Sequence, residues 1–66
     1  MEVQVNGEWR AFDDGATVAE VLRAIDAPER GVAVALDGQV VRRGEWAAKP
    51  VPPGARLEIL TAVQGG

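Results

Sequence analysis

The chain has 66 residues, which suffices for one small domain and excludes multi-domain architectures, solenoids and barrels. Ten acidic residues against seven basic ones give a formal net charge of −3, so we expect no nucleic-acid partner, because binding a phosphate backbone requires a basic surface. The sequence contains no cysteine and no histidine, which excludes disulfides, thiolate metal sites and cysteine or histidine catalysis. We therefore expect a domain that folds by hydrophobic packing, without a metal or catalytic residues of its own.

The sequence also gives no sign of a membrane segment. Its longest uninterrupted apolar run, residues 32–36, is far shorter than the roughly 20 residues that a membrane helix requires. No basic region precedes an apolar stretch near residue 1, as a secretory signal would require. We expect a soluble, cytoplasmic protein.

The first predicted elements are two strands joined by a tight turn. Apolar and polar residues alternate over 1–5, and Asn6-Gly7 follows, a pair that tolerates positive φ and favours a two-residue hairpin. With that turn length Val3 lies opposite Arg10, and Trp9 points to the other face of the sheet. We expect Trp9 to lie outside the core, where an exposed aromatic side chain suits contact with a partner protein.

A helix is predicted next. Residues 17–20 read Thr-Val-Ala-Glu, the form of a capping box with Thr17 as N-cap, so the helix should begin at Val18. Pro28 disfavours helical backbone before it, so the helix should end near Asp26. Its apolar residues fall at helical spacing on one stripe and should cover one sheet face: Val18, Val21, Leu22 and Ile25.

The second half of the chain predicts three more strands. Residues 32–36 and 39–41 are rich in β-branched residues and flank Asp37-Gly38, a second hairpin signal. Residues 42–55 should be irregular with at most one helical turn, because three prolines and a glycine interrupt 50–54, and Trp46 is expected to pack on the core there. The last strand should span 56–63.

One face of that last strand has a functional interpretation. Leu60 and Ala62 should point away from the helix, and with the small side chains of Ala33 and Ala35 they would form a flat apolar surface. We expect Leu60, Ala62 and Trp9 to contact partner proteins.

The element order predicts a two-layer α+β domain with a mixed sheet of four to five strands and one helix packed on one face. The first and last strands can then lie side by side at the sheet centre, the β-grasp or ubiquitin-like arrangement. We expect this domain to span residues 1–62 and a flexible tail to span residues 63–66.

The tail itself reads Val63, Gln64, Gly65 and Gly66. Two residues without a Cβ make a thin end that another enzyme could thread into a narrow channel. That enzyme could adenylate the carboxylate of Gly66, and attack by a persulfide would then lead to a thiocarboxylate, a usable sulfur donor. The competing interpretation is a frayed end without function.

Short motifs along the chain match a known family. They are Asn6-Gly7, Gly15-Ala16-Thr17-Val18, Ala33-Val34, Val41-Arg42-Arg43-Gly44-Glu45-Trp46, Leu57-Glu58-Ile59 and Ala62-Val63-Gln64-Gly65-Gly66. Through them nearly the whole sequence resembles the ThiS family, the sulfur carrier proteins of thiamine biosynthesis. Two positions depart from the family pattern: Asp37 stands where asparagine is common, and Ala55 stands where an acidic residue is usual.

The resemblance implies a carrier that is not itself an enzyme. An E1-like adenylyltransferase would use ATP to activate Gly66, a sulfur donor system such as a cysteine desulfurase would load it, and a thiazole synthase would receive the sulfur. The carrier would bind no cofactor, since ATP is consumed by the partner enzyme.

Three alternatives stay open. Small subunits of molybdopterin synthase share the fold and the Gly-Gly end, although they are typically longer, and residues 61–64 look like the thiamine branch. A ubiquitin-like covalent modifier would use the same tail. A binding module would carry the Gly-Gly end incidentally.

Overall fold

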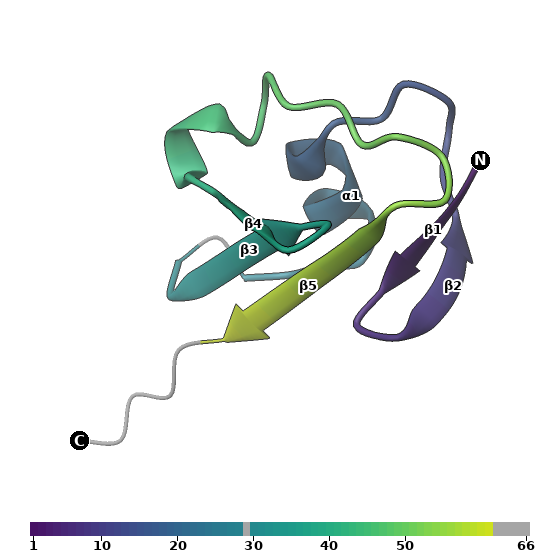
Figure 1. The fold of residues 1–66 in the computed structure, drawn as a ribbon. Coiled ribbons are helices and arrows are strands. Elements are labelled where there is room, and N and C mark those ends of the chain that lie inside the picture. The colour runs from purple at the N-terminus through teal and green to yellow at the C-terminus, as the bar shows by residue number, and fades with distance from the viewer. Residues whose placement is uncertain (29, 62–66) are drawn as a thin grey trace.

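The structure, a computed structural model, describes residues 1–28 and 30–61 (Figure 1). Its elements are β1 (Glu2–Val5), β2 (Glu8–Ala11), α1 (Val18–Ala24), β3 (Val32–Leu36), β4 (Gln39–Val41), the 3₁₀ helix η1 (Arg43–Glu45) and β5 (Arg56–Thr61). The five strands form one sheet in the order β2-β1-β5-β3-β4. β5 is parallel to β1 and antiparallel to β3, so the sheet is mixed and the predicted β-grasp arrangement is confirmed.

Both predicted hairpins are present. Asn6 and Gly7 have φ values of 49° and 86°, and Asp37 and Gly38 have 48° and 87°. Positive φ at both central positions is the type I′ geometry, whose twist matches that of the flanking strands. The expected register is also found, with Val3 opposite Arg10 in the first hairpin.

Helix α1 begins where the sequence predicts. The Thr17 N–H donates to Glu20 Oε1 at 2.8 Å, and the Glu20 N–H donates to Thr17 Oγ1 at 3.2 Å, which completes the capping box. The helix ends at Ala24, close to the predicted end. No helix in the described ranges is long and apolar enough to cross a membrane.

The helix stripe meets the sheet as predicted. Val18 and Val21 are completely buried, and Leu22 is buried beside them, whereas Ile25 at the C-cap is only partly buried. The sheet contributes buried side chains from β1, β3, β4 and β5: Val3, Val5, Val34, Leu36, Val41, Leu57 and Ile59. One layer of valine and leucine between α1 and the sheet therefore forms most of the core.

The segment between β4 and β5 completes that core. It passes over the N-terminal end of α1, where the Val18 and Ala19 N–H groups donate to the carbonyl oxygens of Lys49 and Trp46 at 2.9 and 3.0 Å (Figure 1). These bonds satisfy donors that a helix N-terminus leaves without an intrahelical partner. Trp46 is buried as predicted, and its indole N–H donates to the Val41 carbonyl oxygen at 2.9 Å. Val51 and Ala55 are also buried, which the sequence did not predict.

Candidate functional site

The sheet face that α1 leaves uncovered carries the exposed apolar side chains. Leu60 is 69% exposed near the end of β5, and Val40 on the edge strand β4 is 77% exposed. On β3, Ala33 lies directly opposite Leu60 of β5, and Ala35 lies directly opposite Val40 of β4. Leu60, Ala33 and Ala35 therefore lie together on this face, as predicted, and Val40 extends this apolar surface to the sheet edge. The exposed side chain of Glu58 also lies on this face, opposite Ala35, and Ala62, the remaining residue of the predicted surface, lies outside the described residues.

Trp9 lies apart from that surface. It is 58% exposed, as expected of a residue outside the core. It pairs with Gln4 on β1, which pairs with Arg56 at the start of β5, four positions before Leu60. Strand spacing and rise place Trp9 roughly 16 Å from Leu60. Of the predicted partner-binding residues, Leu60 and Trp9 are thus on one face of the sheet but do not form one continuous patch.

A shallow hollow opens beside Leu60 at the end of β5. Its lining residues are Gly31, Val32, Ala33, Leu60 and Thr61. The chain continues from this point into residues 62–66, so the predicted site residues Ala62, Val63, Gln64, Gly65 and Gly66 lie outside the described residues. The structure describes β5 up to Thr61, the residue that precedes them.

Two turn residues hold β5 at its two ends. At the start of the strand, the Arg56 N–H donates to the carboxylate of Asp37 at 2.8 Å. Near the end, Ile59 is bonded twice by the side-chain amide of Asn6, whose Oδ1 accepts from the Ile59 N–H at 2.7 Å and whose Nδ2 donates to the Ile59 carbonyl oxygen at 3.1 Å. The turn motifs predict both residues as turn formers, but they do not predict these long-range contacts.

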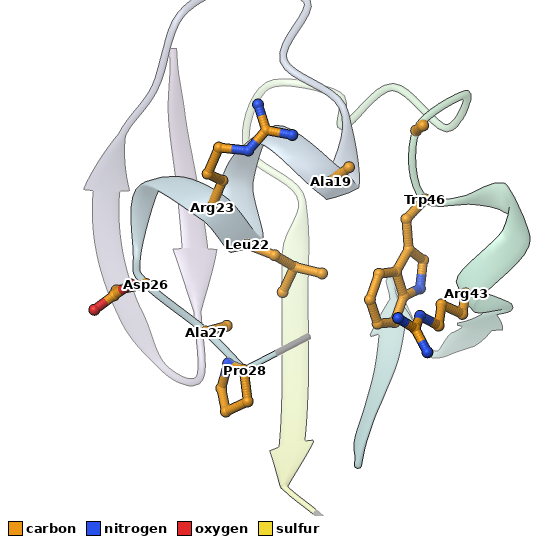
Figure 2. A pocket seen from close by; sticks show the side chains of 9 residues that line it. Ala19, Leu22, Arg23, Asp26, Ala27, Pro28, Arg43 and Trp46 are labelled. Atoms are coloured by element: carbon orange, nitrogen blue, oxygen red, sulfur yellow. The ribbon is translucent and has the colours of Figure 1, made fainter. Parts of the chain in front are cut away.

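A second hollow lies on the helix side of the molecule, between α1 and η1. Figure 2 shows Leu22 and the indole of Trp46 on its two sides, with Arg43 beside the indole and Asp26 directed away. Within the described ranges no group of three or more carboxylates could hold a metal ion. The helix-side hollow is lined by the charged residues Arg23, Asp26 and Arg43, whereas the exposed large apolar side chains lie on the uncovered face of the sheet.

The fold and this face define a class of protein: a ubiquitin-like β-grasp domain whose central strand leads from an exposed apolar surface into a C-terminal Gly-Gly sequence. A sequence model of the ThiS family matches residues 3–66. The chain is 30% identical to the sulfur carrier protein ThiS of Escherichia coli strain K12, over the full length of both chains. The chain therefore belongs to the ThiS family of sulfur carrier proteins of thiamine biosynthesis.

Further relatives agree with this assignment. The crystal structure of a thiamine biosynthesis protein (ThiS) from Geobacter metallireducens matches with a TM-score of 0.85 and 32% identity over the whole of both chains. A solution structure of a thiamine biosynthesis protein from the same organism matches with a TM-score of 0.78 and 33% identity, over this whole chain and 88% of the other. A thiazole synthase of Paramagnetospirillum magneticum is 33% identical over this whole chain, which spans 20% of that protein's length.

Proposed function

We propose that this protein carries sulfur as a thiocarboxylate on Gly66. The observation that carries the proposal is the end-to-end similarity to a sulfur carrier protein, which includes the Gly-Gly end of this chain. The proposal needs no catalytic side chain on the carrier, in keeping with a sequence that contains neither cysteine nor histidine. The protein acts as a cosubstrate, and the enzymes that activate and unload it supply the chemistry.

Loading requires three steps. An E1-like adenylyltransferase joins the Gly66 carboxylate to AMP from ATP and releases pyrophosphate. The terminal sulfur of a persulfide, generated from cysteine by a desulfurase, attacks the acyl carbon and displaces AMP, which leaves an acyl disulfide. A second thiol then supplies two electrons to cleave the sulfur–sulfur bond and release the thiocarboxylate. ATP is consumed in the partner enzyme, so the carrier binds no cofactor, and the need for ATP and thiols favours the cytoplasm.

The recipient of the sulfur is a thiazole synthase in this proposal. The relative named thiazole synthase contains a segment similar to this whole chain within a polypeptide about five times as long. Such a chain joins a carrier-like segment to further sequence in one protein, which supports a partnership between the two parts. The apolar surface around Leu60 and Ala33 is the docking face in this scheme, because it adjoins the point where the tail continues.

Mass spectrometry tests the proposal directly. Incubation with the E1-like enzyme, ATP, cysteine, a cysteine desulfurase and a thiol should replace one oxygen by sulfur on the C-terminal peptide. Deletion of Gly66 should abolish the change and leave the circular dichroism spectrum intact, because a terminal residue adds little to the core. An isopeptide bond from Gly66 to lysines, with no thiocarboxylate, would instead establish a covalent modifier. If neither product forms, the binding-module interpretation replaces both.

A further inference from the structure

The side chain of Asn6 lies where β5 would otherwise have no hydrogen-bonding partner on the side of β1. β1 pairs with β5 through Gln4 and Val5, and the Asn6 N–H still donates to the Leu57 carbonyl oxygen at 2.9 Å. The chain then turns away at Gly7 into β2. Ile59 is the next residue of β5 after Leu57 whose peptide groups face β1, and no strand residue is left there to pair with them.

The amide of Asn6 replaces the missing strand. Its oxygen lies 2.7 Å from the Ile59 nitrogen and its nitrogen lies 3.1 Å from the Ile59 oxygen, so one side chain satisfies both groups of one residue. Only an amide with its oxygen toward the N–H does this, because a carboxylate has no donor for the carbonyl oxygen. Both bonds are partly buried, which protects them from competition with water.

Beyond Ile59 the strand is supported from one side. Leu60 and Thr61 pair with Ala33 and Val32 on β3. On the side of β1 the Asn6 amide is the last contact that holds β5 before residue 62, among the hydrogen bonds of the described residues. The end of β5 is therefore held by β3 on one side and by this one side chain on the other.

We propose that Asn6 is a positioning residue for the activation of Gly66. The inference rests on the proposed function and adds to it: fixing Ile59 presents Leu60 and the end of β5 to the adenylating enzyme in one orientation. Loss of the amide bonds releases the end of β5 on the side of β1, and the enzyme must then order it during binding. Such a cost raises the KM for the carrier and leaves kcat unchanged once the tail is bound.

The other hairpin provides a matched control. Asp37 holds the equivalent turn position, with φ of 48° against 49° for Asn6, and its carboxylate bonds to β5 at Arg56, the end remote from the tail. Glycine tolerates positive φ, so Asn6→Gly and Asp37→Gly keep their turns and remove only the side-chain bonds. The two variants differ in which end of β5 is released.

The experiment measures pyrophosphate release by the E1-like enzyme with each carrier at saturating ATP. We expect Asn6→Gly to raise the KM for the carrier roughly threefold to tenfold at unchanged kcat, because bonds to water partly replace the two lost hydrogen bonds, and Asp37→Gly to change it less than about twofold. Amide hydrogen exchange at Ile59 should quicken in Asn6→Gly and stay as in the wild type in Asp37→Gly.

The outcomes separate the two proposals. If the wild-type carrier elicits no pyrophosphate release, the proposed function fails. If the wild type is active and Asn6→Gly has the same KM as Asp37→Gly, Asn6 has no positioning role. If Asn6→Gly melts below the assay temperature, Asn6→Asp replaces it, since it keeps the acceptor for the Ile59 N–H and loses the donor. A KM for Asn6→Asp equal to that of the wild type would overturn the inference.

Discussion

Replacing Val21 tests how the core is built. Its side chain is completely buried in the stripe of α1 that faces the sheet. Val21→Ala removes two buried methyl groups and should lower the free energy of unfolding by about 2 kcal/mol, including the cavity left behind. Val21→Asp loses the same apolar contacts and adds several kcal/mol for an unpaired buried carboxylate. A domain of 66 residues has roughly 3–10 kcal/mol in total, so Val21→Asp should not fold.

Tryptophan fluorescence in a urea titration measures this series. Trp46 is buried and reports on the core, whereas Trp9 is already 58% exposed in the folded protein and its emission should change less on unfolding. The control is Ala24→Asp, which places the same carboxylate on the exposed side of α1 and should cost only about 1 kcal/mol. If Val21→Asp and Ala24→Asp unfold cooperatively at the same urea concentration, the assignment of the apolar stripe to the core is wrong.

Two further predictions concern the helix cap and the docking face. Thr17→Ala removes the acceptor for the Glu20 N–H and should lower the free energy of unfolding by about 1 kcal/mol. A urea titration should show this as a lower midpoint at unchanged slope. An unchanged midpoint would show that the capping box adds no stability. Leu60→Asp changes a side chain on the exposed face, and because aspartate is a poor strand former it should lower the free energy of unfolding by about 1 kcal/mol while raising the KM of the adenylating enzyme for the carrier. Ala24→Asp on the opposite layer should leave that KM unchanged, and equal values for the two variants would exclude Leu60 from the docking face.

The regular elements were predictable because each carries a local signal. The hairpins at 6–7 and 37–38 need positive φ at both turn positions, and few residue pairs other than Asn-Gly and Asp-Gly tolerate it. The capping box likewise marks the first turn of α1 within four consecutive residues. Period-two alternation predicted which side chains of β5 are buried, including Leu57 and Ile59.

The burial of Val51 and Ala55 could not be predicted in the same way. Both lie in a proline-rich segment without regular structure, where side-chain direction follows no period. Val51 is directed inward because its N–H donates to the Ala16 carbonyl oxygen at 2.9 Å, a contact between distant parts of the chain. Ala55 departs from the family pattern, and its small side chain is buried beside the start of β5. Asp37, the other departure, accepts a backbone hydrogen bond through an oxygen that asparagine would also provide.

The contacts of Asn6 with β5 likewise could not be predicted from a local sequence pattern. Asn6 and Ile59 are 53 positions apart in the sequence, so no local pattern could reveal that a turn former is also hydrogen-bonded to the last strand. The two faces of β5 differ. Leu57 and Ile59 face the core, and Leu60 faces outward on the other side of the strand. We therefore expect a substitution on the buried side of β5 to act on folding, and we predict that one on the exposed side acts on partner binding. Asn6 is bonded to the backbone of β5 and not to the side chains on either face of the strand. Its loss should therefore alter how the end of β5 is presented, while the side chains on both faces keep their contacts.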